Sequence, residues 1–101
     1  MDMTNCASEV FYREGYGSFE KFMFDSALLI ALSKIDQYEA ECGSYRQKYG
    51  MDIMDFESFL HKEKGGEDQK KEEDFEDWEF ATHAVKWWKE KANELRDSKT
   101  R

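Results

Sequence analysis

Apolar residues recur along residues 18–49 at steps that alternate between four and three. Side chains at this spacing return to one face of an α-helix and form a seam along which a second helix packs. The pattern therefore predicts one long helix at about 18–49. Ser18 is suited to cap its first turn, and Gly50 to the left-handed conformation that ends a helix. The eight residues of this first seam are Phe24, Leu28, Ala31, Ile35, Tyr38, Cys42, Tyr45 and Tyr49.

A second seam with the same alternation lies near the C-terminus and predicts a helix at about 74–97. The charged residues of this segment are ordered, with acidic ones from Asp74 to Glu79 first and basic ones from Lys86 to Arg96 last. That order favours a helix because it complements the helix macrodipole. The six residues of the second seam are Trp78, Ala81, Val85, Trp88, Ala92 and Leu95.

A short helix is predicted between the two seams, at about 53–63. Asp52 is placed to cap its first turn. Met51 and Phe56 flank this cap at the spacing of a hydrophobic staple, which fixes the direction in which the chain enters a helix. The following glycines, Gly65 and Gly66, are suited to end the helix.

These three elements predict an all-α fold. The helices at 18–49 and 74–97 form an antiparallel helical hairpin, and the short helix at 53–63 connects them. Residues 67–74 contain no apolar residue. Such a segment is typical of a solvated linker or of a frayed helix start.

The remaining residues divide the chain into one domain and two ends. Residues 1–17 contain two glycines near their end and are predicted to form a flexible N-terminal arm. The run Val10–Tyr12 within this arm has the composition of a strand. Residues 18–97 make up the single helical domain, and residues 98–101 make up a tail.

Large apolar residues remain outside both seams and are candidates for an interface. One possibility is that the short helix and the N-terminal arm cover them within the chain. The other is that they contact another protein, which the number of rings favours because a core this small rarely needs them and exposed apolar patches mark contact sites. A homodimer centred on residues 28–32, which completes a helical bundle, is the simplest such interface. The candidate interface residues are Phe19, Phe22, Met23, Leu29, Ile30, Phe80 and Trp87.

Composition narrows the class of partner. The chain has 101 residues, and its 15 basic and 23 acidic side chains give a net charge of −8. This charge disfavours binding to nucleic acid or to an anionic membrane and favours a basic protein partner. The longest apolar run, at 27–32, is far shorter than the about 20 residues that span a bilayer. Because there is no secretory signal and there are only two cysteines, we expect a cytoplasmic protein with reduced thiols.

Residues that often carry chemistry occur here in patterns that do not predict catalysis. His61 and His83 each follow a glutamate by four residues, Glu57 and Glu79, which is the spacing of a solvated pair on a helix surface. Cys42 lies on the first seam, as a buried structural thiol does. There is no glycine-rich phosphate loop, Cys-x-x-Cys or Ser/His/Asp signature. We therefore expect a protein without enzyme activity, metal site or cofactor.

Two stretches resemble a group of small acidic helical proteins from bacteria and archaea, many of them without an assigned function. The stretches are SKIDQYEAECGSYRQKYGMDIMDFESFL at 33–60 and EEDFEDWEFATHAVKWWKEKANEL at 72–95. In that group a Lys-Tyr-Gly turn, a capped short helix and a late Trp-rich acidic helix follow one another. Some members look like the antitoxin partner in toxin–antitoxin gene pairs. The resemblance covers about residues 33–95 and transfers no catalytic residue.

The resemblance and the residue patterns lead to one hypothesis. The chain is a non-catalytic helical interaction module, antitoxin-like, that neutralises a basic partner and forms a homodimer when alone. Proteins of that kind lay apolar helical faces and carboxylates onto a basic partner. The main alternative is a structural or regulatory bundle that only self-associates. A nucleic-acid mimic is a further alternative, disfavoured because the negative charge clusters in one stretch instead of following a duplex.

Overall fold

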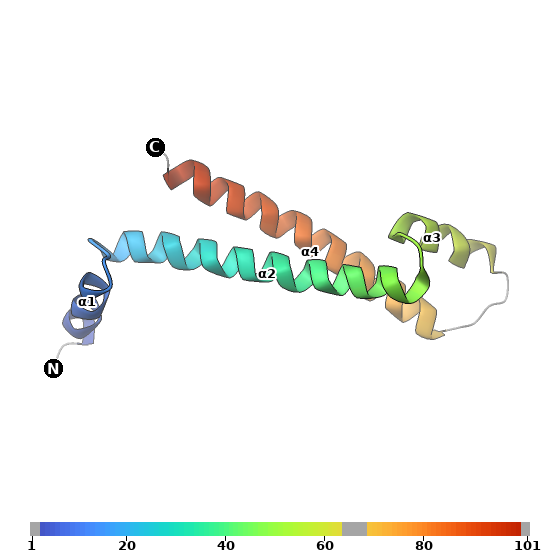
Figure 1. Cartoon of the computed structure of the whole chain (residues 1–101), viewed down its shortest axis with the longest axis horizontal. Helices are drawn as coiled ribbons and strands as arrows, with labels where there is room; N and C mark the ends of the chain where they lie inside the picture. Colours follow the sequence, from blue (N-terminus) through green and yellow to red (C-terminus); the bar gives the residue numbers. More distant parts are fainter. Residues whose placement is uncertain (1–2, 64–68, 100–101) are drawn as a thin grey trace.

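The computed structural model describes residues 3–63 and 69–99, and every regular element in these ranges is a helix. In chain order these are α1 (Met3–Arg13), α2 (Phe19–Tyr49), α3 (Ile53–Lys62) and α4 (Gln69–Lys99). The predicted all-α hairpin is confirmed. Figure 1 shows α2 and α4 antiparallel and in contact along much of their length, with α3 at the end where the chain turns.

The ends of α2 are set by the two residues that the sequence indicates. The Ser18 side chain accepts a hydrogen bond of 3.1 Å from the backbone N–H of Lys21, which satisfies a donor that the first helical turn leaves unpaired. Gly50 has φ 67° and ψ 24°, the left-handed conformation, and its N–H donates to the carbonyl of Arg46 at 2.8 Å. A helix of 31 residues therefore begins and ends where predicted.

The start of α3 also follows the prediction. Asp52 has an extended backbone, and its carboxylate accepts a hydrogen bond of 3.0 Å from the N–H of Asp55. Of the predicted staple, Phe56 is a buried member of the core cluster, and Met51 is partly buried and packs against that cluster. The helix ends at Lys62, where Glu63 is its C-cap. The predicted stop at 65–66 lies outside the described residues.

Helix α4 begins five residues earlier than the second seam predicts. Residues 69–74 are helical, so this stretch is the start of a helix, as one of the two alternatives has it, and the linker alternative is wrong there. Residues 67–68 lie outside the described ranges. Charged pairs hold these turns in place of apolar contacts. Lys70 and Asp74 form a pair of 3.4 Å within the helix, and Lys71 forms one of 3.3 Å with Glu63 at the end of α3. The spacing of apolar residues contains no information about such charged pairs. The second seam therefore predicts a helix start that is too late in the chain.

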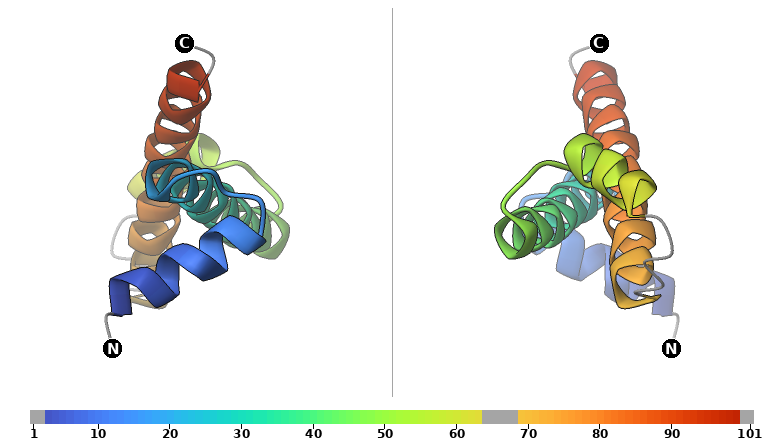
Figure 2. Two further views of the ribbon diagram at one scale, coloured as in Figure 1. Left: turned by 90° about the vertical axis from the view of Figure 1, so that its left-hand side faces the viewer. Right: turned by 90° about the vertical axis from the view of Figure 1, so that its right-hand side faces the viewer.

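The N-terminal arm is a helix, and the strand-like interpretation of Val10–Tyr12 is wrong. A single strand leaves its backbone groups unpaired unless another strand lies beside it, whereas a helix pairs its own. After α1, Gly15 adopts φ 92° and redirects the chain into α2. Figures 1 and 2 show α1 and the C-terminal half of α4 on opposite sides of the start of α2. The flexibility of the arm stays a prediction.

The C-terminal tail that the sequence predicts at 98–101 begins within α4, because this helix extends to Lys99.

The core lies at the end of the hairpin where α3 packs. Its buried residues are Cys42 from α2, Phe56 from α3, and Trp78 and Ala81 from α4. At the other end, which we call the free end, two small residues are buried, Ala31 and Ala92. Figure 1 shows α2 and α4 drawing apart toward this free end. The largest side chains there are therefore left without a common core.

The molecule is long and thin. Its principal extents are 65 × 33 × 17 Å, and its radius of gyration is 20.4 Å, whereas a compact domain of this length has about 13 Å. A helix with its side chains is about 10–12 Å across, so the shortest extent holds fewer than two layers of helix. Large parts of α2 and α4 that point away from their seam are consequently exposed, except where α1 and α3 pack on them.

Candidate interaction surface

The two seams face each other in a constant register. Tyr45 stacks on Trp78 with ring centroids 5.9 Å apart. Four residues later in α2, Tyr49 meets Asp74, which lies four residues earlier in α4. The same register places Ala31 opposite Ala92, and both of these small side chains are buried.

None of the fourteen seam residues is exposed. Ala31, Cys42, Trp78, Ala81 and Ala92 are buried. The others are partly buried: Phe24, Leu28, Ile35, Tyr38, Tyr45, Tyr49, Val85, Trp88 and Leu95. The seam between α2 and α4 thus encloses a core only near α3 and is partly open elsewhere.

Six of the seven candidate interface residues are exposed. They are Phe19, Met23, Leu29, Ile30, Phe80 and Trp87, with exposed fractions from 51% to 70%. Phe22 differs, because α1 brings the ring of Phe11 against it at a centroid distance of 4.0 Å. Covering within the chain therefore accounts for Phe22 and leaves the other six large side chains in contact with solvent.

A shallow groove runs along one side of the α2–α4 seam. It consists of three adjoining hollows of about 520, 400 and 310 Å³. The first and second share Tyr38 and Phe80, and the second and third share Trp88. The lining of the middle hollow on α4 is completed by His83, Ala84 and Trp87. We call this feature the aromatic groove.

Edge-to-face ring contacts shape the aromatic groove. Tyr38 meets Phe80 at a centroid distance of 5.9 Å, and Trp87 meets Trp88 at 4.8 Å with an interplanar angle of 89°. The ammonium of Lys91 lies 5.3 Å from the centroid of the Trp87 ring. Despite these contacts, Phe80 remains 64% exposed and Trp87 51% exposed.

The charges beside the aromatic groove differ between its two ends. Glu41 and Asp77 line the hollow nearest α3. Burial raises the pKa of Tyr45 in this hollow, and the negative charges of Asp77, Asp74 and Glu41 raise it further. At the other end Lys91 and Glu94 form a pair of 3.2 Å. The α3 end of the groove is therefore acidic, whereas the other end carries one basic and one acidic side chain.

Asp74 and Phe56 are the residues that sequence reasoning missed. Asp74 belongs to the stretch 67–74, which its composition assigns to a solvated linker or a frayed helix start, but it is 2% exposed and accepts hydrogen bonds from Tyr49 and Lys48. Asp74 lies four residues before Trp78, so extending the second seam by one step identifies it. Phe56 was assigned only to the short helix, yet it is fully buried and lies 5.6 Å from the Trp78 ring.

Residues considered for chemistry lie apart from the aromatic groove or at its edge. The His61 imidazole is 3.8 Å from the Glu57 carboxylate on the surface of α3, and exposed His83 borders the groove. Cys6 is exposed, whereas the Cys42 thiol is buried and lies 3.6 Å from the Thr82 hydroxyl. Among residues 3–63 and 69–99, no group of three or more His, Cys, Asp or Glu side chains is arranged to hold a metal ion. In the same ranges no helix is long and apolar enough to cross a membrane.

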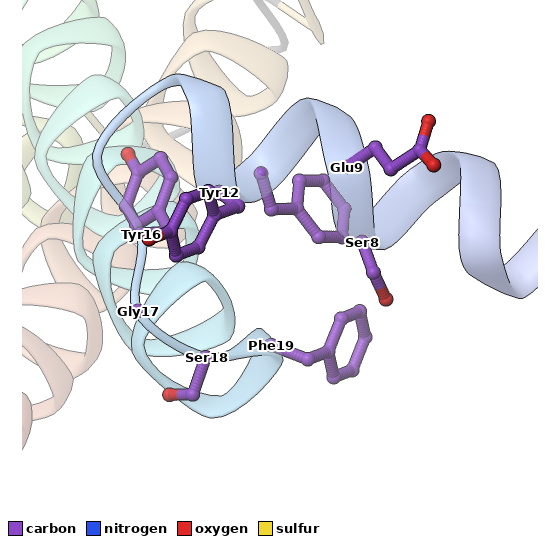
Figure 3. A pocket seen from close by; sticks show the side chains of 8 residues that line it. Ser8, Glu9, Tyr12, Tyr16, Gly17, Ser18 and Phe19 are labelled. Atoms are coloured by element: carbon purple, nitrogen blue, oxygen red, sulfur yellow. The ribbon is translucent and has the colours of Figure 1, made fainter.

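A further hollow of about 410 Å³ lies in the corner between α1 and α2 (Figure 3). Its walls come from Phe11 and Tyr12 on α1, Tyr16 in the turn and Phe19 on α2. Figure 3 shows the Glu9 carboxylate pointing away from this hollow. The hollow is therefore an aromatic gap beneath an incompletely packed helix.

The comparison with known proteins identifies no relative. No protein-family model, no curated protein and no solved structure matches the chain.

Proposed function

We propose that this protein is a non-catalytic helical interaction module that binds an amphipathic helix of a basic protein partner in the aromatic groove. The observation that carries the proposal is the position of Phe80 and Trp87. Both rings stand more than half exposed along a groove that already has partly buried aromatic walls. Exposed aromatic residues beside a pocket are typical anchors of protein interfaces.

The size of the aromatic groove suits a helix. Its lining on α4 extends from Asp77 to Leu95, which is about 27 Å at 1.5 Å per residue. A ligand helix of about five turns matches this length. Such a ligand places apolar residues at steps of three and four against the groove, as helix-in-groove complexes do.

The charge of the molecule favours a basic ligand. The net charge is −8, and Glu41 and Asp77 lie beside the groove at its α3 end. Carboxylates at the rim of an apolar groove attract a cationic partner and orient its helix. The small acidic helical proteins that residues 33–95 resemble include some antitoxin-like members, which agrees with this arrangement. In an antitoxin-like role, binding in the groove would occupy and neutralise a basic toxin.

A test starts from the adjacent gene. If that gene encodes a small basic protein, the two proteins should form a complex on co-expression, with a dissociation constant measured by calorimetry. Trp87→Ala should weaken the complex by about tenfold or more, as loss of an aromatic anchor does. Met54→Ala is the matched control, because Met54 is 71% exposed but lies on α3. An adjacent basic protein that does not bind, or binds both variants equally, would contradict the proposal.

A structural or regulatory bundle that self-associates is the second candidate. It is favoured by the apolar side chains of α2 that point away from the groove, such as Leu29 at 70% exposure. The two functions respond oppositely to salt. Binding of a basic partner should weaken as salt rises, whereas association of two acidic chains should not.

A further inference from the structure

Helix α2 has a long face without charge on the side opposite α4. At 100° per residue, a set of positions from residue 19 to residue 40 clusters on that side, and none of them carries a charge. We call this set the rear face of α2. Its members are Phe19, Phe22, Met23, Ser26, Leu29, Ile30, Ser33, Gln37 and Ala40. Charged residues make up 38% of the chain, so a charge-free strip of about six turns is unusual for this surface.

Other parts of the chain leave most of the rear face uncovered. Helix α4 packs on the opposite side of α2, and α3 packs at the far end. Helix α1 reaches only the first turns, where Phe11 contacts Phe19 and Phe22. From Met23 to Ala40 the members of the face are exposed, apart from the half-buried Ser26.

The length of the rear face distinguishes between two surfaces of this protein as its cover, helix α1 and the rear face of a second copy. Helix α1 has 11 residues and a length of about 16 Å. The rear face extends over about 33 Å, so α1 folded back along α2 covers half of it at most. The rear face of a second copy has the same length and the same absence of charge, and it covers the whole strip.

Side-chain size gives the pairing a direction. The first half of the rear face holds large residues, Phe19, Phe22 and Met23, and the second half holds small or slender ones, Ser33, Gln37 and Ala40. Antiparallel pairing places the large half of one copy against the small half of the other, whereas parallel pairing places large against large. Interdigitation of large and small side chains is how helix interfaces reach interior packing density.

We infer that the rear face of α2 binds a second copy of this chain in antiparallel orientation, with a two-fold axis beside Leu29 and Ile30. The contact is isologous, so each copy contributes the same residues. The paired α2 helices lie at the centre, and each α4 packs on the outside of its own α2. This surface meets the aromatic groove only at Gln37, which also lines the hollow nearest α3. Its other members lie outside the groove, so the inference does not rest on the proposed partner.

The first test measures association of the full chain by sedimentation equilibrium. The wild type should form dimers, and Leu29→Gln should raise the dissociation constant by about tenfold or more. Met54→Gln is the matched control, because Met54 and Leu29 are 71% and 70% exposed. Both variants should retain the wild-type melting temperature at low concentration. A monomeric wild type, or equal effects of the two variants, would overturn the inference.

The second test maps the pairing by disulfide cross-linking in a Cys6→Ser background. Ile30→Cys lies beside the proposed axis and should cross-link to its own copy. Ser26→Cys and Ser33→Cys should not cross-link alone but should do so when mixed, because antiparallel pairing places position 26 opposite position 33. Self-linking of Ser26→Cys alone would indicate parallel helices and overturn the orientation.

The third test separates this surface from α1 and from the aromatic groove. Removal of residues 1–14 should leave the dimer or weaken it, since α1 lies only at the edge of the rear face. Tighter association after this removal would show that α1 is the occupant, and the inference would fail.

Two further measurements separate the dimer contact from the aromatic groove. Trp87→Ala should leave the dissociation constant of the dimer unchanged. Added salt should tighten the dimer, since each copy carries a net charge of −8, and salt weakening would overturn the inference.

Discussion

The phenol of Tyr49 donates a hydrogen bond of 2.5 Å to the carboxylate of Asp74, and this bond joins the last turn of α2 to the second turn of α4. The same carboxylate accepts a hydrogen bond of 2.6 Å from the ammonium of Lys48. Asp74 is buried beside the aromatic core, and a buried charge of this kind is tolerated only when it is paired and hydrogen-bonded. The two helices therefore meet at a polar contact next to their apolar core.

Asp74→Asn should destabilise the fold by about 1–3 kcal/mol, the range for hydrogen bonds to a charged group. The amide keeps the shape of the carboxylate but loses the charge that Lys48 approaches. Urea unfolding at pH 7 measures the free energy of unfolding. Asp77→Asn, at an exposed position on the same helix, is the control and should change it by no more than about 0.5 kcal/mol. Equal effects of the two variants would show that burial of Asp74 contributes nothing.

The stabilisation from Asp74 should depend on pH. Burial by itself raises the pKa of Asp74, but hydrogen bonds from Lys48 and Tyr49 outweigh burial, so its pKa is lowered from 3.8. A carboxyl with a lowered pKa in the folded state stabilises the fold fully above its unfolded pKa, and the effect is lost as pH falls through the folded value. The difference in unfolding free energy between wild type and Asp74→Asn should therefore be constant near neutral pH and shrink below about pH 4. A difference that grows on acidification would contradict this assignment.

Gly43 within α2 and Gly50 at the C-cap of α2 should respond oppositely to substitution by alanine. Gly50 has a positive φ of 67° at the end of the helix, so Gly50→Ala should destabilise the protein by about 1 kcal/mol. Gly43 lies inside the helix, and an added Cβ there meets nothing within 4 Å. Gly43→Ala should therefore stabilise the protein by about 0.5–1 kcal/mol. Thermal melts of the two variants measure both signs, and a shift of the same sign for both would contradict the assigned conformations.

The periodic parts of the fold could be predicted from the sequence. The pairing of Tyr45 with Trp78 follows from two seams with the same alternation of steps, because both stripes must be buried and a short connection makes them antiparallel. The ends of α2 follow from Ser18 and Gly50 for a local reason, since capping and left-handed backbone depend on the residue itself. These features need no knowledge of distant contacts.

The remaining features depend on contacts between elements. The cover over Phe22 comes from Phe11, and the turn between their helices depends on the conformation at Gly15. Asp74 is charged and lies among charged residues, so hydropathy assigns it to the surface, and only the facing Tyr49 explains its burial. The candidate interface residues could be predicted as apolar positions outside the seams, but the groove beside Trp87 depends on where α2 lies against α4.

Metal binding can be tested directly. Both histidines are exposed, and the His61 side chain lies 3.8 Å from Glu57, with no third ligand arranged beside it among the described residues. A chelator should therefore leave the melting temperature unchanged, and equimolar zinc should raise it little. A structural zinc site contributes folding energy directly, so a large rise with zinc that His61→Ala abolishes would reveal a site formed in solution.

The three tryptophans of α4 should separate folding from binding. Trp78 is 1% exposed and packs against Tyr45 and Phe56. Trp78→Ala should destabilise the fold by about 3–5 kcal/mol, as deletion of a buried ring does. Trp88 is only partly buried because the free end of the hairpin has no third element over it. Trp88→Ala should therefore have roughly half that effect.

Trp87 lies one residue before Trp88 and about 100° away around the helix, so it stands at the rim of the aromatic groove while Trp88 lines its floor. Half of its surface is already in water, and Trp87→Ala should change the free energy of unfolding by about 1 kcal/mol or less. The same variant should lose affinity for the partner, because an exposed ring in a groove gains most of its contacts on binding. Urea unfolding and calorimetry on the three variants give the comparison. If Trp87→Ala unfolds as easily as Trp78→Ala, the ring belongs to the core and cannot serve as the anchor of an interface.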